Sequence, residues 1–171
     1  MELMPPQEGG AAGGAVAPKH RVLDLATLAQ TPDLAKVYRW WDGARAAKGR
    51  LPRVCEVDPL ALPPALLPFI TLSDVLYDPL RVRVRLAGTG VCTRHGREIK
   101  GMYLDELYDG LDLEMVMASV HAVVASREPD LAERRMRTRH DKYLQLLRLV
   151  LPLAEGSRIT GLLIAIRFDN A

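Results

Sequence analysis

The chain has 171 residues, a length that suits one domain with a substantial hydrophobic core. Hydrophobic residues make up 49% of it and charged residues 26%, which is typical of a globular protein. The formal net charge of +2 is too small to indicate a nucleic-acid or membrane partner, so only a local cluster of charge could do so.

The cysteines and the apolar stretches bear on the compartment. Cys55 and Cys92 lie far apart without a CxxC pair, which predicts no disulfide framework and favours a reducing compartment. The N-terminal residues show no basic leader followed by an apolar run, so we expect no secretory signal. The apolar stretches around residues 60–70 and 144–153 are too short and too interrupted to span a bilayer. We therefore expect a cytoplasmic protein without a membrane partner.

Composition divides the chain into three segments. Residues 1–20 are rich in Gly, Ala and Pro and offer little to bury, which predicts a flexible tail. Residues 21–48 are expected to form an N-terminal helical segment, and residues 49–171 the main domain.

The first strong element is an amphipathic helix over residues 31–48. Thr31 can cap it, Pro32 suits its first position, and Gly49 is a natural stop. Its apolar residues recur at the spacing of a buried helical stripe: Leu34, Val37, Tyr38 and Trp41.

Prolines then interrupt the chain, so only short helical turns are expected between residues 59 and 67. Residues 69–75 alternate large apolar and small polar side chains, which predicts a strand. Residues 81–87 alternate without exception, with arginines on one side and apolar residues on the other, and predict a second strand. Gly88-Thr89-Gly90 then loosens the backbone.

The second half predicts one helix and three strands. The helix covers residues 112–126, and the strands cover residues 131–138, 143–151 and 161–168. Strands grouped around a helical middle favour an α+β fold with a single antiparallel sheet.

Several short strings occur in a recognisable order and spacing. They read GRLP at 49–52, DPLALP at 58–63, LLPFITLSDV at 66–75, VRLAGT at 84–89 and GREIKG at 96–101. Together they resemble the PAS domain family, and within it a group of short bacterial proteins with one PAS domain and an N-terminal helix carrying Trp. The resemblance covers about residues 33–168.

This resemblance implies a five-stranded antiparallel sheet with helices on one face, preceded by the N-terminal amphipathic helix. It also implies a sensory or signalling module rather than an enzyme. Such a module binds a small molecule or a partner protein and relays its state. No kinase, cyclase or DNA-binding segment follows, so we expect the signal to pass to another chain. The family has no uniform ligand, so the cofactor stays unknown.

Candidate pocket residues are apolar or borderline positions near the predicted middle of the domain. They are Leu86, Met102, Met115, Val120, His121 and Leu149. His121 could be an axial haem ligand, although a partly buried, hydrogen-bonded His is the more common situation. Cys92 lacks the Asn-Cys-Arg-Phe-like string of flavin photosensors, and a buried Cys is usually an inert hydrophobe. No pair of histidines has metal-ligand spacing, and no nucleophile or phosphate-loop motif occurs.

The arginines suggest an alternative function. Should the two Arg-rich strands belong to one sheet, their positive charges could form a surface for an anion, an acidic protein or a nucleic acid. The residues of this candidate surface are Arg81, Arg83, Arg85, Arg135 and Arg137. A solvated sheet face explains the same alternation, and nucleic acid is the less expected partner.

Two adjacent tryptophans give the N-terminal helix a possible interface. Trp41 belongs to the buried stripe, whereas Trp40 lies about 100° around the helix. A partly exposed aromatic on an amphipathic helix often marks an interface, so we expect a homodimer through this helix.

Overall fold

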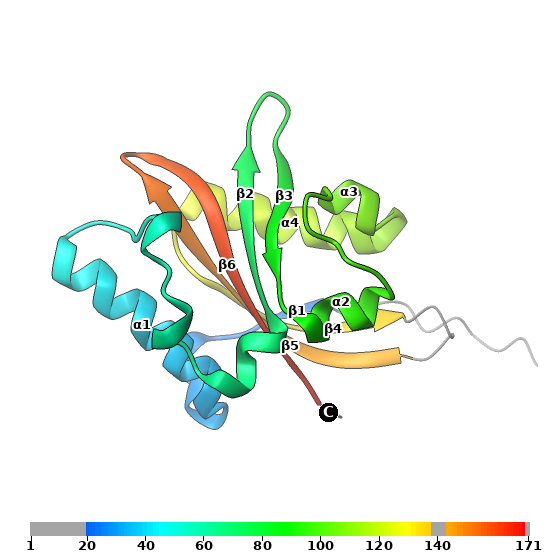
Figure 1. Cartoon of the computed structure of the whole chain (residues 1–171), viewed down its shortest axis with the longest axis horizontal. Helices are drawn as coiled ribbons and strands as arrows, with labels where there is room; N and C mark the ends of the chain where they lie inside the picture. Colours follow the sequence, from blue (N-terminus) through cyan, green and yellow to red (C-terminus); the bar gives the residue numbers. More distant parts are fainter. Residues whose placement is uncertain (1–19, 138–142, 170–171) are drawn as a thin grey trace, which may run out of the picture.

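The computed structural model describes residues 20–137 and 143–169, apart from the side chains of residues 20, 136, 137, 143 and 144. These residues form one antiparallel sheet of six strands in the order β1-β4-β5-β6-β2-β3, with helices packed around it (Figure 1). The predicted α+β fold with a single antiparallel sheet is confirmed.

The strands are β1 (His20–Val22), β2 (Ile70–Leu76), β3 (Arg81–Ala87), β4 (Asp130–Arg137), β5 (Tyr143–Glu155) and β6 (Arg158–Phe168). The α-helices are α1 (Pro32–Lys48), α2 (Thr89–His95), α3 (Leu104–Leu107) and α4 (Gly110–Ser126). Short 3-10 helices fill the connections: η1 (Leu25–Gln30), η2 (Val54–Glu56), η3 (Pro59–Ala61) and η4 (Pro64–Phe69).

Two elements differ from the sequence expectation. The sheet has a sixth strand, because β1 pairs antiparallel with the edge of β4. Three residues are too few to show an alternating pattern, so sequence periodicity could not find β1. The glycine-rich stretch after β3 is not a loose connection but the start of α2, which ends at Gly96 in the left-handed conformation. The rest of the predicted tail lies outside the described residues.

The predicted helix over residues 31–48 is present as α1. Pro32 occupies its first turn and Gly49 ends it at a φ of 61°. Trp41 is fully buried, and its indole Nε1 donates a hydrogen bond of 2.8 Å to the carbonyl of Pro152 in β5. The buried stripe of α1 is thereby attached to the sheet through a specific polar contact.

The sheet has two differently covered faces, because side chains alternate along each strand and directly paired residues share a face. We call the inner face the side that carries Thr71, Ser73, Val150, Leu162 and Ile164, which α2, α3 and α4 cover. The outer face carries the alternate residues, and the N-terminal elements η1, α1 and η2 cover it.

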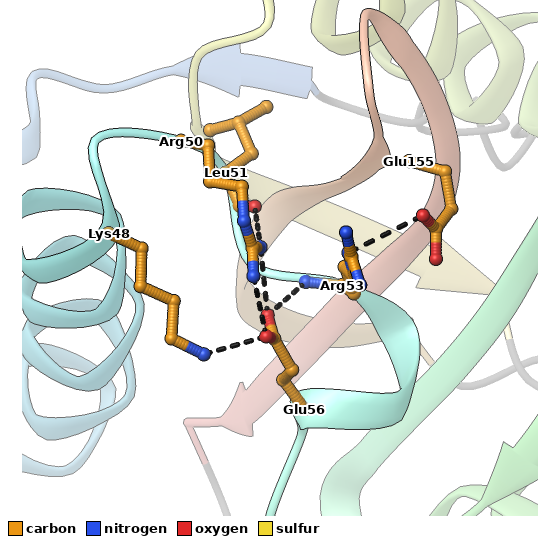
Figure 2. A network of polar contacts seen from close by, with 6 residues as sticks. All are labelled: Lys48, Arg50, Leu51, Arg53, Glu56 and Glu155. Carbon is orange, nitrogen blue, oxygen red and sulfur yellow. Dashed lines mark hydrogen bonds and ion pairs between the residues drawn. The ribbon is translucent and has the colours of Figure 1, made fainter.

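A network of charged groups fixes the end of α1 to the outer face (Figure 2). Glu56 of η2 accepts hydrogen bonds from Lys48 Nζ at 2.6 Å, Arg50 Nη2 at 2.7 Å and the Arg53 backbone N–H at 2.8 Å. Arg53 also forms an ion pair of 3.4 Å with Glu155, the last residue of β5. The bonds from Arg50, Lys48 and Arg53 hold the pKa of Glu56 well below its ordinary value.

The helices of the described residues bear on whether this part of the chain can cross a membrane. Among the helices formed by residues 20–137 and 143–169, none combines the length and the apolar character that crossing a bilayer requires.

Candidate functional site

A cavity of about 50 Å³ lies between the inner face and the helices α2, α3 and α4. Aliphatic side chains from both layers make most of its wall. They are Val84, Val91, Ile99, Leu104, Leu107, Val116, Val120, Val150, Leu162, Ile164 and Ile166. Since a single water needs about 10–15 Å³ of such space, the cavity accommodates only a few non-hydrogen atoms.

Two glycines allow α2 to close one side of this cavity. A Cβ atom at Gly88 would lie 2.3 Å from the carbonyl oxygen of Pro68, and one at Gly90 would lie 2.3 Å from the ring of Phe69. Any side chain at either position would therefore force α2 away from η4. The close approach places Val91 and His95 of α2 in the cavity wall.

The cavity wall also contains polar groups. The hydroxyl of Ser73 is completely buried and has no hydrogen-bond partner among the described residues. The Tyr108 hydroxyl lies 3.5 Å from His95 Nε2, and the two rings meet edge to face at 5.7 Å. Burial raises the pKa of Tyr108, so this residue stays neutral and able to donate a hydrogen bond.

The most unusual polar group of the wall is Arg148 of β5. Its side chain is only 8% exposed, and its Nε and Nη2 have no hydrogen-bond partner among the described residues. The nearest carboxylate is Asp130 of β4, whose Oδ2 lies 3.7 Å from Nη2. Burial lowers the pKa of Arg148, and Asp130 counters part of this effect. Arginine starts from so high a pKa that the group keeps its charge at neutral pH.

A second buried arginine lies next to it. Arg134 of β4 is 6% exposed and donates from Nη2 to the Met115 carbonyl at 2.7 Å, and its Nε has no partner among the described residues. Burial and the neighbouring charge of Arg148 lower the pKa of Arg134 to about 9, which still leaves it protonated at pH 7. Both arginines line a smaller cavity of about 30 Å³, which shares Tyr108, Val116 and Ile166 with the larger one.

The predicted pocket residues divide into two groups. Val120 lines the larger cavity and Met115 lines the smaller one. Met102 packs beside the larger cavity, against the cluster formed by Val84, Val91 and Ile99, and does not line it.

The remaining three point elsewhere, for reasons of local geometry. A β-bulge between β2 and β3 pairs Leu86 with Leu72, which turns Leu86 to the outer face, where it is 53% exposed. Leu149 is fully buried, but it neighbours Arg148 in β5 and therefore faces the outer side. His121 lies on the exposed side of α4, so it is neither a ligand in the cavity nor a partly buried residue.

Sequence reasoning missed Arg148, Tyr108 and His95, which share the polar part of the wall with Ser73 and Thr71. One signal was available for Arg148. It is a lone charge inside the otherwise apolar run from residue 146 to 151, and such a residue is rarely buried without a partner or a function. Tyr108 and His95 follow no pattern that the sequence could reveal.

The arginines do not form one surface, because β3 and β4 are separated in the sheet by β2, β6 and β5. On β3, Asp74 forms ion pairs with Arg83 at 3.2 Å and Arg85 at 2.7 Å. Arg81 is paired with Asp105. Arg135 lines the smaller cavity, and the side chain of Arg137 lies outside the described residues. The proposed single basic face is therefore corrected to two separate groups, of which the β3 group is paired with carboxylates.

The cysteines and tryptophans have the following environments. Cys92 is half-buried in α2, and burial raises the pKa of its thiol, while Cys55 is exposed. Within the described residues, no three His, Cys, Asp or Glu side chains gather into a metal site. Trp41 is fully buried, whereas Trp40 is half-buried and packs at the margin of the core.

Comparison with known proteins gives a match to a family model and similarity to solved structures. The model is that of the PAS domain, and it matches residues 29–164. The chain is also similar to the crystal structure of a sensory box histidine kinase/response regulator from Burkholderia thailandensis E264. That similarity has 16% sequence identity and a TM-score of 0.41, and it covers 60% of this chain and 78% of that chain. None of the curated proteins matches this chain.

Proposed function

The chain belongs to the PAS domain family, and on that premise we propose that it is a non-catalytic sensory module that receives a small molecule in the cavity. Within the family we place it among short bacterial proteins that combine one PAS domain with an N-terminal helix carrying Trp. Its bound state passes to another protein, in the cytoplasm.

The observation that carries this proposal is the unsatisfied polar wall of an apolar cavity. The Ser73 hydroxyl and the Arg148 Nε and Nη2 groups are buried without a partner among the described residues. Each such group costs about 1–3 kcal/mol, so a folded protein retains it where it has a function or where a ligand or water satisfies it. A mostly apolar pocket with a few convergent polar groups is the usual design of a small-molecule site.

The sheet supplies a route from the cavity to the N-terminal helix. Strand β5 carries Arg148 and Val150 on the inner face, and the Pro152 carbonyl of the same strand holds Trp41 of α1. The network around Glu56 fixes the end of α1 to the outer face of the sheet (Figure 2). A ligand that displaces β5 therefore changes the position of α1 on the sheet. The half-buried Trp40 of α1 offers a surface to a second copy or a partner.

The proposal is tested by native mass spectrometry of the freshly purified protein, compared with its denatured mass. We expect an additional mass that is lost on denaturation. The cavity-filling variant Val120→Ile should lose this mass, because it adds a methyl group to a cavity of about 50 Å³. The matched control Val124→Ile lies on the same helix but outside the cavity wall, and should keep it. If none of the three proteins loses mass on denaturation, and no small molecule binds in solution, the proposal is overturned.

A further inference from the structure

Arg148, in the wall of the cavity, has two side-chain donors without a partner among the described residues. The Nε and Nη2 groups of an arginine point the same way and match the two oxygens of a carboxylate. In this chain Arg81 shows the filled form of that geometry. Its Nε and Nη2 each donate to one oxygen of Asp105, both at 2.8 Å. The same two nitrogens of Arg148 have no acceptor among the described residues.

The nearby carboxylates do not satisfy these two donors. Asp130 Oδ2 lies 3.7 Å from Arg148 Nη2, beyond hydrogen-bond distance. The same oxygen accepts a hydrogen bond of 2.5 Å from the Ser119 hydroxyl. Asp112 lines the smaller cavity beside Arg134, and its charge acts on that arginine. The charge of Arg148 is thus balanced at a distance, while its N–H donors stay available to a further acceptor.

The wall around these two donors indicates the rest of the ligand. Ile166 is the direct β6 neighbour of Arg148, and Val116, Val120 and Ile164 continue the apolar lining. An inorganic phosphate would lose its hydration against these groups without compensation, whereas an alkyl chain is stabilised by them. The volume of about 50 Å³ limits this chain to a few carbons.

We propose that Arg148 holds the carboxylate of a short aliphatic acid through its Nε and Nη2 groups, with the alkyl chain in the apolar part of the cavity. This inference rests on the proposed function, since it names the ligand class of the same cavity.

The test is a calorimetric titration of the full chain with sodium butyrate, with butyramide as a neutral compound of the same shape. We expect saturable binding of butyrate and at least about tenfold weaker binding of butyramide, because only the anion forms charge-assisted bonds with both donors. Arg148→Lys keeps the charge but loses the pair of donors, and Arg148→Met loses both. Each should weaken butyrate binding at least about tenfold, while the surface variant Arg39→Met, at an exposed position of α1, should bind as the wild type does.

The outcomes separate this inference from the proposed function. Equal binding of butyrate and butyramide, unaffected by the Arg148 substitutions, would overturn the inference and leave a ligand-receiving cavity. Failure of both compounds to bind would also overturn it, and the mass measurement above would then decide the proposed function alone. Should both Arg148 variants fail to fold, the comparison of acid and amide on the wild-type chain still gives the decision.

Discussion

The attachment of α1 to the sheet can be tested by replacing Trp41 with Phe. Trp41 is fully buried, and its Nε1 donates to the Pro152 carbonyl at 2.8 Å. The substitution removes this donor, which costs about 1 kcal/mol, and leaves a space where the larger ring was, which costs a further 1–2 kcal/mol or so. We therefore expect a loss of about 2–3 kcal/mol in the free energy of unfolding, or roughly 5–10 °C in Tm for a domain of this size.

The assay is urea unfolding followed by circular dichroism, because Trp fluorescence would lose one of its two reporters. Trp40→Phe is the matched control, since Trp40 is only half-buried and should lose less than about 1 kcal/mol. A Trp41→Phe protein as stable as the wild type, or less affected than Trp40→Phe, would refute the attachment of α1 through Trp41.

Three further predictions concern the charged network at the end of α1, the packing of α2 against η4 and an interface on α1. Glu56→Gln should lower the urea midpoint more at pH 7 than at pH 3, because a carboxylate whose folded pKa is depressed stabilises the fold fully above its unfolded pKa of about 4.3 and loses this contribution gradually as the pH falls from there toward the folded pKa. Equal losses at both pH values would argue against the ion pairs. Gly90→Ala should destabilise the fold by about 1–3 kcal/mol, because its Cβ would lie 2.3 Å from the Phe69 ring. Gly43→Ala, in open space on α1, should be neutral or stabilising by up to about 1 kcal/mol in the same unfolding assay, and a reversed order would contradict the packing of α2. We propose that two copies pair through α1, so the wild type should have the mass of a dimer in light scattering and Trp40→Ala that of a monomer. An equal mass for both proteins would count against an interface on α1.

The elements that the sequence predicts well are those whose own residues determine them. The strand over residues 81–87 and the helix over 31–48 carry complete periodic patterns, and both appear with nearly the same bounds. The orientation of Leu86 could not be predicted in this way. One bulged residue between β2 and β3 reverses the alternation after Val84, and the cause lies in the pairing of two strands.

The cavity wall was predicted only in part for the same reason. Val120 belongs to a helical stripe that the sequence displays, and it lines the cavity. Arg148 of β5 and Tyr108, which follows α3, meet at the cavity only through tertiary packing of the helices on the inner face. The separation of the two arginine groups likewise follows from the strand order, which no local pattern encodes.

The proposed binding of a short aliphatic acid to Arg148 inside the cavity can be observed directly. The most direct measurement is an NMR titration of the isotope-labelled chain with butyrate, which follows the Arg148 Nε–H signal and the backbone amides. We expect the Arg148 signal and the amide signals of cavity residues such as Val120 and Ile164 to shift together, and the shift changes to saturate as butyrate is added. Shifts confined to residues of the outer face, or an Arg148 signal that stays in place throughout the titration, would contradict it.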